Sequence, residues 1–218
     1  TNMPKKLIIT LLLLLLSSAA FLEAQKKYKA GVVRWPVKIS VVESKMKKKA
    51  KRISLQRLLF MQNPQDVKKN DARYQDDRIP YFDNPLKVGE GDIVRTMGWF
   101  HLVGFEDDGD YHIQISRKKG SGDSCIIVEV PHPDFVTGKM KQRAERVRKF
   151  VRDKMCGGKE PSGSGKVIKT PQHVYIIGQM FFDSWHVGDA KPRGMKGMKA
   201  ATLWELHPVT AIGFAKEP

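Results

Sequence analysis

The chain has 218 residues, of which 41% are hydrophobic and 9% aromatic, and it carries a formal net charge of +16. This composition excludes wholesale disorder and supplies enough apolar area for a packed core, while the basic charge favours anionic partners. The length suits one domain with an extension better than two domains.

Residues 1–24 have the pattern of a cleavable secretory signal. Two lysines precede the apolar run Leu7–Leu16, which is too short to span a bilayer, and Ser17–Ala20 supplies small residues for cleavage after Ala20 or near Ala24. We therefore expect an exported protein, periplasmic or extracellular, with no transmembrane span after signal cleavage. An uncleaved membrane anchor is the alternative.

Residues 25–90 are expected to form a basic arm and an irregular connector. Fourteen Lys and Arg lie within residues 26–69 against two acidic residues, so this segment carries a net charge of +12, whereas residues 70–218 carry +3. Six basic residues form a dense run, namely Lys45, Lys47, Lys48, Lys49, Lys51 and Arg52. This run could bind an anionic polymer, either nucleic acid or an envelope polymer, or it could be a solvated tail.

The segment Val32–Val42 within the arm is rich in β-branched residues and predicts a strand with a break at Pro36. Such a strand could pair with an exposed sheet edge of a neighbouring molecule, which would make self-association the function of the arm. Residues 63–88 that follow are rich in Asp, Asn and Pro and predict a long connector wrapped on the domain.

Residues 91–218 are predicted to form the folded domain, because five short strand-like runs occur there. The runs are 93–104, 111–116, 125–130, 173–182 and 201–214. The first two flank an Asp-Gly turn, which is a strong hairpin signal, and Gly178 in the fourth predicts a bulge or a close approach. Alternation along the second run places Tyr111 in the core.

One amphipathic helix is predicted over Met140–Met155, where apolar residues recur at helical spacing until two glycines follow. The order of three strands, one helix and two strands resembles the OB-fold, a five-stranded Greek-key barrel. The expected fold class is therefore mainly β with one helix, an OB-like barrel preceded by a basic N-terminal arm.

The closing segments FFDSWHVGD and TLWELHPV are also similar to a group of uncharacterised exported bacterial proteins. The likeness extends from about Ser54 to Phe214 and implies no activity. Secreted staphylococcal-type nucleases also place an OB barrel outside the cell, but the strands here carry few arginines, with Arg95 alone on the first.

Acidic and imidazole side chains cluster in the predicted strands and turns. The candidate metal ligands are Asp110, His112, Glu129, Asp183, His186, Glu205 and His207. In strand geometry Asp110 and His112 share a face, as do Glu205 and His207, so each pair could present ligands to a divalent metal that activates water. Alternatively, these polar groups are satisfied internally in the core.

The two cysteines, Cys125 and Cys156, could form a disulfide in an exported chain, or they could be two buried free thiols. Three functions remain open. The leading hypothesis is a non-enzymatic OB-like module that binds an anionic polymer through its arm. The alternatives are a nuclease-like, metal-dependent hydrolase that uses the carboxylates and imidazoles, and a subunit of an extracellular assembly formed by strand addition through residues 32–42.

Overall fold

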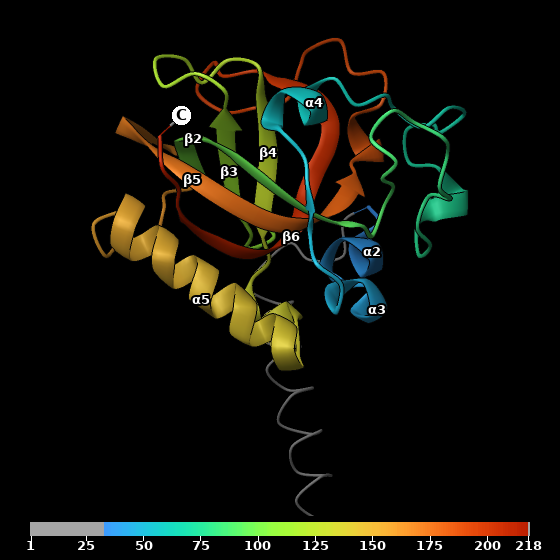
Figure 1. Ribbon diagram of the computed structural model, residues 1–218, viewed down its shortest axis with the longest axis horizontal. Helices are drawn as coiled ribbons and strands as arrows, with labels where there is room; N and C mark the ends of the chain where they lie inside the picture. The colour runs from blue at the N-terminus through green and yellow to red at the C-terminus, as the bar shows by residue number, and fades with distance from the viewer. Residues whose placement is uncertain (1–32, 218) are drawn as a thin grey trace, which may run out of the picture.

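The computed structural model describes residues 33–217, so the expected signal peptide lies outside the described residues. The described chain is mainly β with few helices (Figure 1). Its strands are β1 (Lys51–Arg52), β2 (Ile93–Phe105), β3 (Tyr111–Ser116), β4 (Cys125–Val130), β5 (Lys166–Phe182) and β6 (Ala200–Phe214). Its α-helices are α2 (Trp35–Ile39), α3 (Glu43–Met46), α4 (Leu55–Leu59) and α5 (Gly138–Met155), and 3-10 turns lie at Ala72–Tyr74, Pro133–Phe135 and Ser184–His186.

Strands β2 to β6 form a closed barrel. The strand order is β2-β3-β4-β6-β5, and a further pairing of β2 with β5 closes the circle. Strands β4 and β6 run parallel, whereas the other neighbours in the barrel run antiparallel. Because α5 connects β4 to β5, this is the connectivity of an OB-like Greek-key barrel, and the expected fold class is confirmed. Strand β1 is a short extra strand that pairs with β2.

Gly178 lies where β5 and β6 shift register, as its position in the sequence predicted. A Cβ atom added at this glycine would lie 2.8 Å from Cβ of Leu206 and 3.2 Å from the carbonyl oxygen of Pro208. Only a residue without a side chain permits this close approach of the two strands. Strand β6 carries Glu205 and His207, so the bulge lies beside the candidate site.

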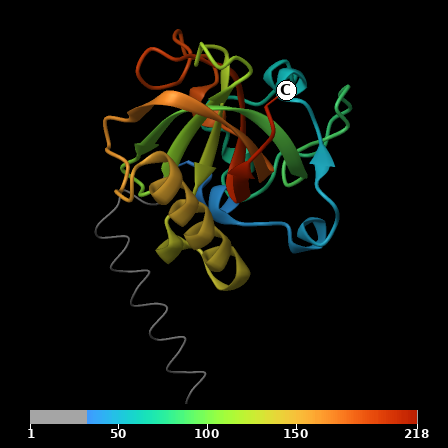
Figure 2. The same ribbon diagram turned by 60° about the vertical axis from the view of Figure 1, so that its left-hand side comes forward.

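Helix α5 crosses one end of the barrel, while α4 lies on the opposite side (Figures 1 and 2). The helix ends where Gly157 and Gly158 adopt φ angles of 65° and 82°, as expected from the sequence. On its buried face, Arg148 stacks 3.6 Å from the ring centroid of Tyr111, itself fully buried as predicted, and donates a 2.9 Å hydrogen bond to the carbonyl of Gly109. The helix therefore holds the β2–β3 turn that carries several candidate residues.

The segment expected to be a separate basic arm packs against the barrel instead. Ile53, Leu55 and Leu58 are buried in the same core as the barrel strands, and so are Ile79 and Leu86 of the connector. A stretch of chain that buries this much apolar surface is part of the fold rather than a solvated tail. The hydrophobic core therefore includes residues on both sides of position 91.

The strand expected over Val32–Val42 is wrong for the residues described, because Trp35–Ile39 form helix α2. Arg34 caps this helix with a left-handed φ of 58°, and Pro36 occupies the first turn, where its missing N–H is not needed. Trp35 and Val37 are buried. Tertiary packing has therefore overridden the β-branched composition, and a free strand for addition to a neighbour is not present in residues 33–42.

The six-residue basic run is spread over different environments. Lys45 forms an ion pair with Asp92 at 2.6 Å, and Lys51 donates a 2.7 Å hydrogen bond to the carbonyl of Leu86. The three lysines of 47–49 and Arg52 are exposed. Anion binding by this run stays a prediction.

Cys125 and Cys156 are both free and buried, so the disulfide that the sequence left open is not formed. Cys125 begins β4 and accepts a hydrogen bond from the side chain of Gln114, whereas Cys156 caps the C-terminus of α5. Among residues 33–217, no helix combines the length and apolar character needed to cross a membrane.

Candidate functional site

Polar side chains from three neighbouring strands meet on the outer face of the barrel, where other parts of the chain bury them. His112 on β3 is the register partner of Glu129 on β4, and β4 lies beside β6, which carries Glu205 and His207. These four side chains belong to residues that are at most 5% exposed. Period-two alternation places them on the outer face of the barrel, because Tyr111 and the other residues that alternate with them belong to the hydrophobic core.

Glu129 is the centre of this group. Its Oε1 lies 3.1 Å from Nδ1 of His112, while its Oε2 lies 3.0 Å from Nδ1 of His207 and 3.1 Å from Nζ of Lys38. The two carboxylate oxygens therefore serve two different sets of partners. Burial would raise the pKa of Glu129, but Lys38 and the two imidazoles outweigh it and hold the pKa well below its ordinary value.

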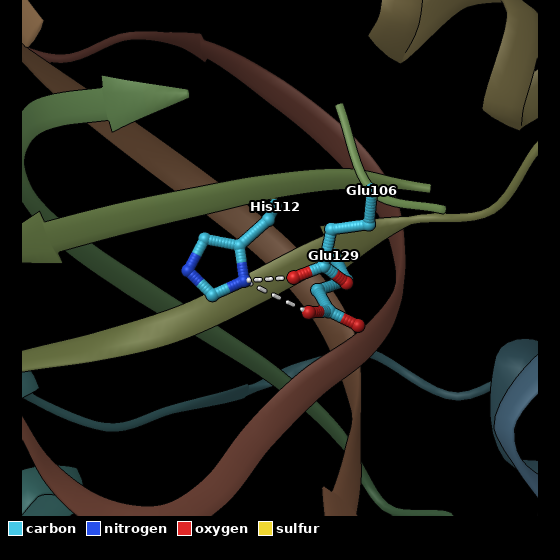
Figure 3. Close-up of side chains that lie close together, drawn as sticks. All are labelled: Glu106, His112 and Glu129. Carbon is cyan, nitrogen blue, oxygen red and sulfur yellow. Dashed lines mark hydrogen bonds and ion pairs between the residues drawn. The ribbon is translucent and has the colours of Figure 1, made fainter. Parts of the chain in front are cut away.

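The ring of His112 points one nitrogen at two carboxylates, as Figure 3 shows. Nδ1 lies 3.0 Å from Oε1 of Glu106 and 3.1 Å from Oε1 of Glu129. Burial alone would lower the pKa of His112, but the hydrogen bonds to these two carboxylates raise it to about 10. The pKa of Glu106 is in turn raised by burial and by the charge of Glu129.

The tautomer of His112 follows from its other nitrogen. Nε2 lies 3.3 Å from Oε1 of Gln114. The amide of Gln114 has one orientation, because its Oε1 accepts a 2.6 Å hydrogen bond from the N–H of Met195 and its Nε2 donates to the carbonyl of Met198. Nε2 of His112 must therefore be the donor, which leaves Nδ1 to carry a second proton or to bind a cation.

A second imidazole, His207, also lies between carboxylates. Its Nε2 is 3.3 Å from Oδ2 of Asp110, and neither atom has a hydrogen-bond partner among the described residues, although both residues are 0% exposed. Burial raises the pKa of Asp110 well above its ordinary value, and burial followed by the charge of Lys38 lowers the pKa of His207. Unpartnered buried polar atoms are rare in proteins and often mark functional sites.

Among the described residues, Lys38 is the one lysine whose ammonium contacts this group of carboxylates. Its Nζ lies 2.8 Å from Oδ2 of Asp108, 3.1 Å from Glu129 and 3.4 Å from Oδ2 of Asp110. Burial disfavours the charged ammonium, yet these carboxylates raise the pKa of Lys38 well above its ordinary value. The ammonium of Lys38 is therefore stabilised in its charged form beside these carboxylates.

Arg193 connects the inner group to the rim. Its guanidinium forms close ion pairs with Glu205, on the outer face of β6, and with Asp183, which follows β5. His186 lies nearby, with its Nδ1 2.6 Å from Oδ2 of Asp189 and its Nε2 3.7 Å from Asp183. The side chain of His186 is 33% exposed, so this imidazole is accessible to solvent.

A cavity of about 480 Å³ is lined by residues of the inner group and by residues of the rim. Lys38, Glu106, His112 and Glu129 line its inner part, and the rim includes His186. This volume is within the usual range for small-molecule sites. Titratable groups with shifted pKa values at the wall of such a cavity are typical of a functional site.

Two groups of three side chains have ligand atoms that all lie within 4.8 Å of one another. One is Glu106, His112 and Glu129, and the other is Asp110, Glu129 and His207. Both combine carboxylate oxygens with an imidazole nitrogen, a set that binds zinc, manganese or iron in proteins. The first group faces the cavity, and the second is buried behind it.

All seven candidate residues of the sequence lie in this region. Asp110, His112, Glu129, Glu205 and His207 form the inner group, whereas Asp183 and His186 belong to the rim. Glu205 and His207 share a face as predicted, with Oε2 and Nδ1 3.9 Å apart. The alternative, in which these polar groups are satisfied by partners within the protein, describes Glu205, because Glu205 forms an ion pair with Arg193.

Sequence reasoning missed Lys38, Glu106 and Arg193, whereas Asp108 stands beside Asp110 in the acidic cluster of the predicted hairpin. Lys38 lies in a segment with many lysines, and Arg193 lies in a loop without periodicity, so neither carried a distinguishing signal. Glu106 belongs to the acidic turn between β2 and β3, and such a turn is most simply explained by the hairpin itself. The number of carboxylates next to Asp110 is the one signal that points to Glu106.

No protein-family model matches this sequence, and neither a curated protein nor a solved structure matches it.

Proposed function

We propose that this chain is a metal-dependent hydrolase whose divalent cation is held by Glu106, His112 and Glu129. One observation carries the proposal: Nδ1 of His112 faces two carboxylate oxygens at 3.0 and 3.1 Å on the wall of a cavity, while Nε2 is committed to Gln114. A metal ion satisfies all three ligand atoms at once, and the acceptor on Nε2 is the usual support of a metal-binding histidine.

The surroundings support hydrolysis at this position. A divalent metal with two or three protein ligands and open positions lowers the pKa of a bound water toward neutrality. Glu129 is held on its far oxygen by Lys38 and His207, which aims the near oxygen at the cavity. At the rim, His186 is accessible to solvent and paired with Asp189, so it can donate a proton to a leaving group.

The cations of the cavity favour an anionic substrate. Lys38, Arg193 and Lys191 all line it, and positive charge near the reacting centre stabilises the charge that develops during phosphoester hydrolysis. We therefore propose nuclease-like chemistry on a phosphodiester. The pattern of residues 1–24 adds that the enzyme acts outside the cytoplasm.

Hydrolysis of bis(p-nitrophenyl) phosphate by the purified chain tests the proposal in the presence of Mn²⁺, Zn²⁺, Mg²⁺ or Ca²⁺. We expect turnover that requires one of these metals and falls by at least about 100-fold in Glu106→Gln and His112→Gln. His173→Gln, which changes a half-buried imidazole that does not line this cavity, is the matched control and keeps the activity. A chain that neither binds nor responds to any of the four metals contradicts the proposal.

A second candidate function, binding of an anionic polymer, is favoured by a groove on the outer face of β2. Arg52, Arg95 and Arg117 line this groove of about 670 Å³ together with His173 and the exposed Met97. None of the three arginines forms an ion pair with a described residue. Guanidinium groups without a carboxylate partner are suited to phosphate or sulfate groups, whatever the polymer.

Retention on heparin and on single-stranded DNA tests this second function. Replacing Arg52 and Arg95 with Gln should lower the salt concentration of elution and reduce the dependence of binding on log[salt] by about two. Lys87→Gln removes a cation whose side chain is paired with Asp83 and serves as the charge control. If the double variant and the control elute at the same salt concentration, the groove does not bind the polymer.

A further inference from the structure

The second ligand group is arranged around two oxygen atoms. Oδ2 of Asp110 and Oε2 of Glu129 both face the ring of His207, at 3.3 Å from Nε2 and 3.0 Å from Nδ1. Oδ2 of Asp110 and Nε2 of His207 have no hydrogen-bond partner among residues 33–217, and both residues are 0% exposed. Buried atoms of this kind indicate a position for a cation.

The ammonium of Lys38 contacts the same two oxygens. Nζ lies 3.4 Å from Oδ2 of Asp110 and 3.1 Å from Oε2 of Glu129, and a third contact of 2.8 Å reaches Oδ2 of Asp108. The first group uses the other oxygen of Glu129, Oε1, which faces His112. Glu129 therefore bridges two cation positions, as a carboxylate does in a two-metal centre.

The fold holds Lys38 firmly at this position. Helix α2 begins after Arg34, whose guanidinium donates 2.6 and 2.7 Å hydrogen bonds to the two oxygens of Glu90 and another to the carbonyl of Phe182. Val37, next to Lys38, is 2% exposed. The lysine side chain is 13% exposed. Its ammonium contacts the carboxylates from helix α2, which the buried Arg34 and Val37 hold against the rest of the fold.

We infer that Lys38 is a built-in cation that fills the second position of a carboxylate-bridged centre, leaving one position, at Glu106, His112 and Glu129, for a metal. The inference rests on the proposed metal site. A two-metal centre places two positive charges beside the reacting group, and here one of them is covalently attached to the chain and does not dissociate. Removing the ammonium should open the second position to a second metal ion.

The stoichiometry of Mn²⁺ binding to the full chain tests the inference without any measurement of activity. Titration calorimetry and metal analysis after gel filtration should give one Mn²⁺ for the native chain and two for Lys38→Met. Lys45→Met is the matched control, since Lys45 pairs with the half-buried Asp92 and lies away from Glu129, and it should bind one.

The outcomes separate the inference from the proposed function. No Mn²⁺ bound to the native chain overturns both. One ion in the native chain and one in Lys38→Met overturns the inference alone, and two ions in the native chain overturn it as well, because the ammonium then does not hold the position.

Asp110→Asn keeps the inference testable if Lys38→Met does not fold. The asparagine retains Oδ1, which accepts a 3.0 Å hydrogen bond from the N–H of His132. Because Asp110 belongs to the position that Lys38 fills, this variant should bind one Mn²⁺ with an affinity within about twofold of the native chain. An affinity lower by about tenfold or more would make Asp110 a ligand of the native metal and overturn the inference.

Discussion

Arg34 and Glu90 form a buried two-pronged ion pair, with Nη1 to Oε1 at 2.6 Å and Nη2 to Oε2 at 2.7 Å. Arg34 is 1% exposed, and its Nε donates to the carbonyl of Tyr74. Glu90 also accepts the N–H groups of Ile79 and Phe182. The pair therefore joins the N-terminal segment, the connector and β5, which are far apart in the sequence.

Arg34→Met should lower the free energy of unfolding by about 3–5 kcal/mol, because Glu90 is left as an unpaired buried charge. Urea denaturation measures the change. The control is Lys87→Met, which breaks an exposed ion pair with Asp83 and should cost less than about 1 kcal/mol. Equal effects of the two substitutions would show that the buried pair does not anchor the segment.

Gly178→Ala should destabilise the barrel by about 1–3 kcal/mol, because the new methyl group meets Leu206 and the backbone of Pro208 in the bulge between β5 and β6. Thermal unfolding monitored by circular dichroism provides the measurement. Gly120→Ala is the control, since nothing lies within 4 Å of a Cβ atom added there. An unchanged melting temperature in Gly178→Ala would contradict the close approach of the two strands.

His101 predicts a pH dependence of stability. Burial lowers the pKa of this imidazole, against the effect of its hydrogen bond to the carbonyl of Lys118, so the folded protein favours the neutral form. The unfolded chain takes up the proton more readily, and stability is therefore lost as the pH falls through the unfolded pKa of about 6.5 toward the lower folded value.

The measurement compares urea unfolding of the native chain and of His101→Gln between about pH 7.5 and about pH 5.5. The native chain should lose more stability than the variant over this range. Subtracting the two profiles removes the contributions of the other titrating groups. Parallel profiles would mean that His101 has the same pKa in both states.

Gln114→Met should weaken Mn²⁺ binding by about 10- to 100-fold, because Nε2 of His112 loses the acceptor that sets its tautomer and orientation. Gln179→Met is the matched control. Gln179 is also 0% exposed and also hydrogen-bonds loop backbone, at Val42 and Ser40, but it does not contact His112. A similar loss of affinity in both variants would indicate a general packing effect.

Most of the barrel could be predicted because alternation and turn residues are local signals. The hairpin of β2 and β3, the helix that ends before Gly157 and the bulge at Gly178 all follow from residues near one another in the sequence. The segment at Val32–Val42 could not, because its conformation depends on distant partners. Trp35 packs edge-on against Phe135 with ring centroids 5.0 Å apart, and this contact has no signature in the local pattern.

The candidate site was predictable only in part, for a similar reason. Strand alternation places His112, Glu129 and His207 on one face of the sheet, opposite to the core residues, whatever their chemistry. Lys38 looks like the other lysines of its segment, and its role arises only from the anchoring of Arg34 by Glu90. Periodicity thus identifies the site residues that lie within strands, whereas a residue from another segment, such as Lys38, is recognised only in the three-dimensional structure.

Because β6 lies between β4 and β5, the barrel can close only after the last strand has been synthesised. The last strand of the chain fills the place between two earlier ones, so the barrel stays open along those edges until residues 200–214 are available. A chain still leaving the ribosome exposes two unpaired strand edges and has neither Glu205 nor His207 beside Glu129. The buried contacts of Glu129 with His207 and of Glu205 with Arg193 are therefore completed only when synthesis is nearly finished, and until then the open edges are exposed to pairing with other chains.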